Sequence, residues 1–219
     1  MTEQNTIFES FEPDLVDRIA VGRREAITKY AKSAVLWGSA PLTLALASTE
    51  AFGQDLPATV VDVLNFALTL EYLEAAFYEQ GLSSRRLIPS ESRDVFRTIG
   101  RHENEHVALL KSVLGGSAVA QPAVDFTAGG KYADVFENFA TFRLLSETFE
   151  DLGVAAYKGQ AGRLLGTGKI LTVALQIHSV EARHASEVRR IGGKLGWDSA
   201  FDKPKTKAQV LAVAQPFLA

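Results

Sequence analysis

Two short motifs place ligands for metal ions at matching intervals along the chain. Glu103 and His106 form one Glu-x-x-His motif, and Glu181 and His184 form a second. Residues three apart lie on the same face of a helix, so each motif presents a carboxylate oxygen beside an imidazole nitrogen. A single motif of this kind is common by chance, but the second lies 78 residues further along in a similar apolar context. The pair therefore indicates a shared site.

Two further glutamates, Glu71 and Glu150, precede these motifs, and a tyrosine follows each of them after seven residues, Tyr78 and Tyr157. Two helices that each give a Glu and two that each give a Glu-x-x-His form the ligand pattern of dinuclear carboxylate sites in helical bundles. Buried carboxylates are costly unless they are paired, protonated or bound to metal, and two divalent cations would offset four of them. Oxygen and imidazole donors suit iron and manganese, although zinc and cobalt are not excluded. The expected metal ligands are Glu71, Glu103, His106, Glu150, Glu181 and His184.

The helices that must position these residues can be read from apolar residues at spacings of three and four. They are expected at about 59–81, 90–114, 132–160 and 169–194, with a polar connection over 115–131 and a short helix at about 205–213. Two helical hairpins of matched layout joined by a long linker describe a four-helix bundle with one long crossover connection. No stretch alternates as a strand does, so the chain is expected to be all-α.

Composition restricts the classes of function. The chain has 219 residues, of which 47% are hydrophobic, and a formal net charge of −3. It can bury a sizeable core and lacks the basic balance that nucleic-acid binding favours. Absence of cysteine excludes disulfides, thiol nucleophiles and cysteine-ligated clusters. No uninterrupted apolar run reaches 18 residues, which excludes a polytopic membrane protein.

Four stretches resemble the desiccation-related ferritin-like family: NFALTLEYLEAAFYEQGL (65–82), HENEHVALL (102–110), FRLLSETFEDLGVAAYKGQ (142–160) and IHSVEARHASEV (177–188). The resemblance covers roughly residues 57–195. It implies a ferritin-like four-helix domain, often exported. Such domains belong to the ferritin-like superfamily and resemble rubrerythrin, bacterioferritin and manganese catalase. It also implies the same six ligands, with Tyr78 and Tyr157 supporting them or packing in the core.

Two functions are compatible with this reading. In the first, Glu103 and Glu181 bridge two Fe or Mn ions that react with dioxygen or peroxide, as in a ferroxidase, peroxidase or catalase, for metal oxidation or for protection from oxidative or desiccation stress. In the second, the bundle is a structural or interaction subunit without turnover. Neither reading involves nucleic acid, and both leave a homo-oligomer open.

Residues 1–56 differ from the bundle. Arg23-Arg24 followed by the apolar stretch 34–47 resembles a twin-arginine export signal, which would make the protein periplasmic with a mature start near Ser48. The alternative is an integral N-terminal helix of a cytoplasmic protein that docks a partner or a membrane surface. The expected division is thus an extension over 1–56, a bundle over 57–195 and a tail over 196–219.

Other polar residues near the six have secondary roles in this interpretation. Glu74 and Glu147 are alternative ligands but are expected beside the site or on the surface, and Arg143 is expected to pair with Glu147. Residues expected outside the site are His102 and Glu105, on a solvated face, and His178, in the core or at a cap.

Overall fold

The computed structural model describes residues 56–197 and 199–219. The expectations for the export signal and the N-terminal helix therefore lie outside the described residues. No helix in the described part of the chain combines the length and apolarity that crossing a lipid bilayer requires.

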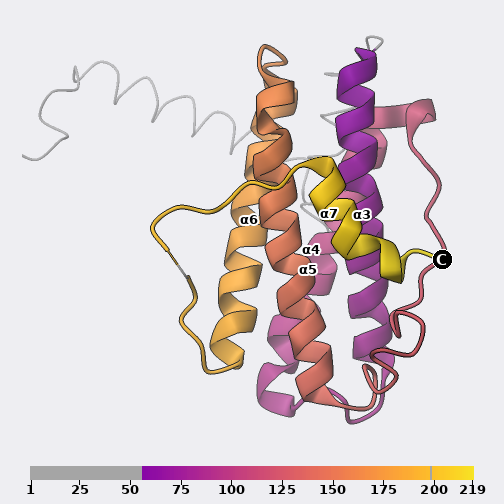
Figure 1. The fold of residues 1–219 in the computed structure, drawn as a ribbon, viewed down its shortest axis with the longest axis vertical. Helices are drawn as coiled ribbons and strands as arrows, with labels where there is room; N and C mark the ends of the chain where they lie inside the picture. The colour runs from indigo at the N-terminus through magenta and orange to yellow at the C-terminus, as the bar shows by residue number, and fades with distance from the viewer. Residues whose placement is uncertain (1–55, 198) are drawn as a thin grey trace, which may run out of the picture. The chain divides into compact units, whose positions relative to one another are not determined.

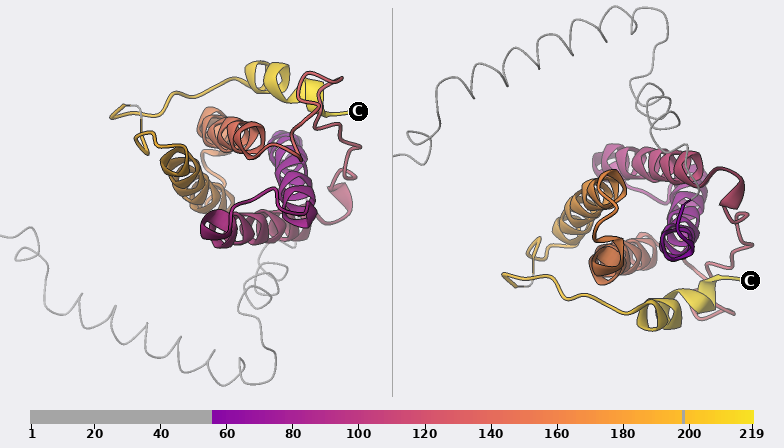
Figure 2. Two further views of the ribbon diagram at one scale, coloured as in Figure 1. Left: turned by 90° about the horizontal axis from the view of Figure 1, so that it is seen from below. Right: turned by 90° about the horizontal axis from the view of Figure 1, so that it is seen from above.

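Four long helices form the body of this part of the chain: α3 (Ala58–Ser83), α4 (Ser90–Leu114), α5 (Phe139–Gln160) and α6 (Lys169–Ile191). Seen along their axes they stand at four corners, where α3 packs on α4 and α5, and α6 packs on the same two helices (Figure 2). The connection from α4 to α5 returns along the length of the bundle, so these two helices run in the same direction (Figure 1). The prediction of an all-α bundle with one long crossover is confirmed.

Residues with special backbone preferences mark the helix ends. Pro89 precedes α4, and Gly115 ends it in the left-handed region at φ 53°. The side chain of Asn138 accepts a hydrogen bond from the backbone N–H of Ala140 at 3.0 Å and so caps α5. Gly193, at φ 73°, follows α6. Helix α6 therefore ends at Ile191, three residues before the predicted end.

The start predicted for the third helix was wrong. Residues 132–137 form turns, and α5 begins only at Phe139. Tyr132 and Val135, which extend the apolar pattern of α5 in the sequence, instead pack the crossover against the aromatic interior. Their spacing of three is that of a helix, but the Asn138 cap sets the boundary.

The C-terminal segment closes one side of the bundle. It contains α7 (Lys207–Ala214), near the predicted 205–213, and the 3₁₀ turn η3 (Gln215–Phe217). Val210 and Phe217 are buried against the core. The backbone then pairs with the crossover, because Asp125 N–H donates to the carbonyl of Phe217 and Ala219 N–H donates to that of Ala123, both at 2.9 Å. The tail and the crossover thus stabilise each other.

Two groups of apolar side chains fill the interior. The aromatic cluster includes Phe77, Phe96, Phe142 and Phe149, and the rings of Phe77 and Phe142 stack with centroids 4.7 Å apart. The aliphatic cluster includes Leu64, Leu68, Leu110 and Ile177. Along α4, for example, Phe96 comes before and Leu110 after the Glu-x-x-His motif, so the ionisable groups lie between the two clusters.

Candidate metal centre

The four helices bring all six sequence-predicted residues to the middle of the bundle. Helices α3 and α5 each contribute one glutamate, and α4 and α6 each contribute a Glu-x-x-His pair. All six side chains are buried, and Glu103, Glu150 and Glu181 are 0% exposed. Charged groups with so little water around them require compensation within the protein or from a cation.

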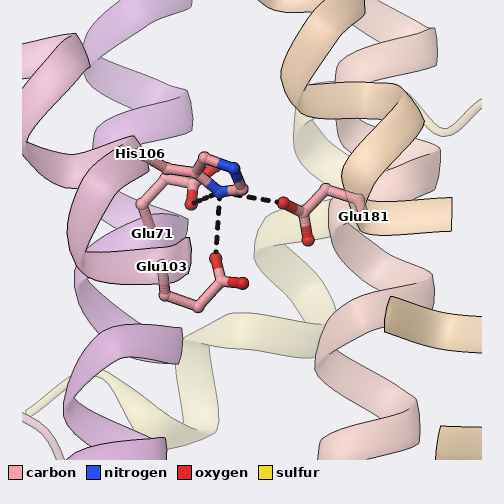
Figure 3. Close-up of side chains that lie close together, drawn as sticks. All are labelled: Glu71, Glu103, His106 and Glu181. Atoms are coloured by element: carbon pink, nitrogen blue, oxygen red, sulfur yellow. Dashed lines mark hydrogen bonds and ion pairs between the residues drawn. The ribbon is translucent and has the colours of Figure 1, made fainter. Parts of the chain in front are cut away.

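One half of the centre surrounds His106. Its Nδ1 atom lies 3.1 Å from Glu71 Oε2, 3.2 Å from Glu103 Oε2 and 3.1 Å from Glu181 Oε1. These carboxylates come from three different helices and point toward the same nitrogen (Figure 3). A single ring N–H cannot satisfy three acceptors well.

The other half surrounds His184 in the same way. Its Nδ1 atom lies 3.0 Å from Glu103 Oε1, 3.2 Å from Glu150 Oε2 and 3.8 Å from Glu181 Oε2. Within each half the ligand atoms all lie within 4.8 Å of one another. Glu103 and Glu181 belong to both halves, each through its two carboxylate oxygens.

The orientation of these atoms fits a cation better than hydrogen bonds. His184 Nδ1, Glu103 Oε1, Glu150 Oε2 and both oxygens of Glu181 are buried without an aligned hydrogen-bond partner, although they lie close together. Ligand atoms that share an octahedral ion at about 2.1 Å are about 3 Å apart, which matches the shortest of these distances. The buried Glu and His groups can therefore hold metal ions.

Without a metal, protons on the two histidines balance part of the negative charge of the carboxylates. Burial alone would lower the pKa of each histidine, but the carboxylates around them outweigh it. They raise the pKa of His106 well above its usual value and the pKa of His184 to about 12. Burial likewise acts to raise the pKa of Glu181, yet the two imidazolium groups lower it to about 2. For Glu150 the effect of burial is larger than the lowering of the pKa by His184 and Tyr78, and its pKa rises to about 7. A cation that enters one half must displace the proton from the imidazole Nδ1 of that half.

The two tyrosines cross between the hairpins. The hydroxyl of Tyr157, on α5, donates to Glu71 Oε1 on α3 at 2.6 Å. The hydroxyl of Tyr78, on α3, donates to Glu150 on α5. Each carboxylate is thus oriented by the tyrosine that follows the other one in sequence. The spacing of seven placed both tyrosines near the site but could not show this exchange.

The two alternative carboxylates differ from each other. Glu147 lies toward the surface, where it pairs with Lys194 at 2.6 Å and with Arg143 at 3.3 Å, so the predicted Arg143–Glu147 pair is confirmed. Glu74 is 3% exposed but belongs to neither ligand group. Burial, then the carboxylates of Glu181 and Glu103, raise its pKa well above 4.5.

His102 is the residue that the sequence reading misplaced. It is partly buried, its ring stacks on that of His184, and its Nδ1 lies 3.0 Å from His184 Nε2. Burial first, and then the charges of His184 and Arg101, lower its pKa. A signal was available in the sequence, because His102 lies four residues before His106 and so shares a helix face with it. Glu105 pairs with Arg101 at 3.1 Å outside the site, and His178 is half-buried.

Comparison with known proteins agrees with this arrangement. No curated protein matches the chain. The family model described as a ferritin-like domain matches residues 59–194, which is more than half of the chain and includes all six clustered residues. The chain therefore belongs to the ferritin-like domain family.

Proposed function

We propose that this protein holds two iron or manganese ions and reacts with dioxygen or peroxide. The observation that carries the proposal is the sharing of Glu103 and Glu181 between both ligand groups. They would bridge the ions, with Glu71 and His106 as terminal ligands of one ion and Glu150 and His184 as those of the other. Four glutamates then balance two divalent charges.

A bound pair of such ions would supply the electron transfer. The protein's own part is positional. Four helices fix the carboxylates, the hydroxyls of Tyr78 and Tyr157 orient two of them, and the apolar clusters on either side exclude bulk water. The corresponding physiological roles are metal oxidation, peroxide removal and protection in oxidative or desiccation stress.

A bundle without turnover is the second candidate, and one observation favours it. The imidazolium groups of His106 and His184 already face the carboxylates, so the centre compensates part of its charge without metal. In this case a metal would only stabilise the fold. Repeated consumption of peroxide or oxidation of Fe(II), lost in Glu103→Ala while the fold is retained, separates an enzyme from a scaffold.

Metal content is the first test. We expect natively purified protein to contain about two Fe or Mn per chain by inductively coupled plasma mass spectrometry. The double variant Glu103→Ala/Glu181→Ala should lose both ions, because both positions depend on these carboxylates. Glu187→Ala, an exposed glutamate on α6, is the matched control and should keep them. Absence of stoichiometric metal after reconstitution with Fe(II) and Mn(II) would contradict the proposal.

We also propose export, based on Arg23-Arg24 and the apolar residues 34–47. The intact mass of native protein should correspond to a chain that begins near Ser48. A mass of 23.7 kDa for the full chain would instead support an integral N-terminal segment that docks a partner or membrane surface.

A further inference from the structure

The two proposed metal positions differ in what supports their histidines. On the ring of His184, Nδ1 faces the carboxylates and Nε2 faces His102 Nδ1 at 3.0 Å. The two rings are nearly parallel, at 18°, with centroids 5.2 Å apart. Both the orientation of the His184 ring and its second nitrogen are therefore held by one neighbouring side chain.

The other motif lacks this support. His102 directly precedes Glu103, whereas the residue in the same place before Glu181 is Val180, whose side chain cannot accept a hydrogen bond. Among the described residues, His106 makes hydrogen bonds only through Nδ1. The two halves match in ligand type but not in the partner behind the imidazole.

This difference bears directly on metal binding. A histidine that binds a metal through Nδ1 must keep its proton on Nε2. At His184 that N–H faces His102 Nδ1 at 3.0 Å, which accepts it when the proton of His102 is on Nε2 and then fixes both the tautomer and the ring orientation of His184. Partners of this kind increase ligand basicity, and their loss typically weakens metal binding about 10–100-fold.

His102 can supply this acceptor as a neutral ring. Its own Nε2 accepts a hydrogen bond from a guanidinium N–H of Arg101 at 3.3 Å, so in this arrangement the proton of the neutral ring lies on Nδ1. That guanidinium is already paired with Glu105 at 3.1 Å. The Arg101 side chain is 60% exposed and can turn away from Nε2 while it stays paired with Glu105. When the ring proton moves to Nε2, Nδ1 of His102 presents its lone pair to His184.

We propose, on the basis of the dinuclear centre proposed above, that His102 is a positioning residue that makes the two metal positions unequal. The position held by Glu103, Glu150, Glu181 and His184 binds its ion first. The position that contains Glu71 and His106 fills second.

Stepwise titration of the metal-depleted full chain with Co(II), competed by a chelator and followed by visible absorption, tests the inference. Wild-type protein should bind two ions, the first at least about 10-fold more tightly than the second. His102→Phe keeps a flat ring but has no acceptor. The dissociation constant of the first ion should therefore rise about 10–100-fold and approach that of the second ion. His102→Gln restores an acceptor oxygen and should recover most of the difference.

Val180→Ala is the matched control, since it changes the equivalent half-buried position of the other motif and should leave both steps unchanged. The hyperfine-shifted proton NMR spectrum provides a readout independent of folding stability. At one equivalent of Co(II), wild type and His102→Gln should show one slowly exchanging imidazole N–H, and His102→Phe should lack it.

The outcomes separate the two proposals. Wild-type protein that binds no Co(II), or only one ion, would overturn the dinuclear centre itself. Two ions bound with equal affinity in wild type, or an unchanged first step and N–H signal in His102→Phe, would leave the dinuclear centre standing and overturn the role of His102.

Discussion

Glu74 is the one buried carboxylate of the centre that no proposed ion would balance. It lies three residues after Glu71 on α3 and makes no hydrogen bond among the described residues. A Cβ atom on Gly153 would lie 3.5 Å from Glu74 Oε1 and 3.3 Å from Glu181 Oε2, so the glycine leaves space beside both carboxylates. Burial and the neighbouring carboxylates raise the pKa of Glu74 well above 4.5, which favours its protonated form next to the ligands.

This protonation has a cost that a variant can reveal. Below the ordinary pKa of 4.5, Glu74 is protonated in the folded and the unfolded chain alike. As the pH rises above that value, the unfolded chain releases the proton while the folded chain keeps it, which favours unfolding. In metal-depleted protein, Glu74→Gln should therefore raise the Tm at pH 7, and the gain should shrink as the pH falls toward 4.5.

Thermal melts across this pH range check the prediction. Each kcal/mol recovered corresponds to about 2–4 °C in a domain of this size. Glu79→Gln, at an exposed position on the same helix, should change little at any pH. An equal Tm for Glu74→Gln and wild type at pH 7 would mean that Glu74 is ionised or compensated in the folded chain.

The six clustered residues could be found from sequence because each lies on the apolar face of its helix, where a charged group is costly unless it is compensated. His102 lies one turn before His106, but its contact could not be predicted from this spacing, since its partner is 82 residues away on α6. Glu74 and Glu147 have similar spacings from Glu71 and Glu150, yet one is buried and the other pairs with Lys194 near the surface. Only the helix rotations in the bundle decide between them.

At the scale of helices, Gly100 sets how closely α4 approaches α3. A Cβ atom there would lie 2.9 Å from Tyr78 Cβ, which cannot move without the backbone of α3. Tyr78 in turn donates to Glu150, and Gly100 lies one turn before Glu103. The contact between these two helices therefore affects both hairpins of the centre.

Gly100→Ala should lower the stability of the bundle. Overpacking costs about 1–3 kcal/mol, which exceeds or cancels the gain of up to about 1 kcal/mol that alanine brings to a helix. We expect a lower Tm and a smaller fraction of protein with two ions, measured on the same preparation. Gly162→Ala, in η2 (Ala161–Leu164) with no atom within 4 Å of its added Cβ, should leave both unchanged. A Tm for Gly100→Ala above that of wild type would contradict the tight contact.

Helix type and order could be predicted because long amphipathic segments carry their own signal. The start of α5 could not, since Tyr132 and Val135 continue its apolar pattern while serving the crossover. Both residues face an aromatic interior assembled from α3, α5 and the tail, and local spacing contains no information about such a surface.

At the scale of the whole described chain, Phe217 joins three distant segments. Its ring stacks on Tyr132 of the crossover with centroids 5.9 Å apart and meets Phe149 of α5 edge-on at 4.9 Å. Its carbonyl accepts the hydrogen bond from Asp125 N–H. One residue of the tail thus contributes to the order of the crossover and the closure of the core.

Phe217→Ala should destabilise the protein by about 3–5 kcal/mol, the usual effect of removing a buried phenyl ring. Amide hydrogen exchange at Asp125 should accelerate as well, because the tail no longer anchors the crossover. Phe201→Ala, which removes a ring that is 84% exposed, is the control and should alter neither quantity. Loss of stability without faster exchange at Asp125 would limit the role of Phe217 to filling the core.

The exchange of tyrosines between Glu71 and Glu150 has a consequence for how the centre can come into being. Neither helical hairpin contains both a carboxylate and the hydroxyl that orients it. Half of the chain, folded by itself, would therefore lack an oriented ligand set, and a high-affinity ion would have to await the meeting of the two halves. Metal uptake would then report the last stage of assembly, and each bound ion would link the two hairpins through ligands from both.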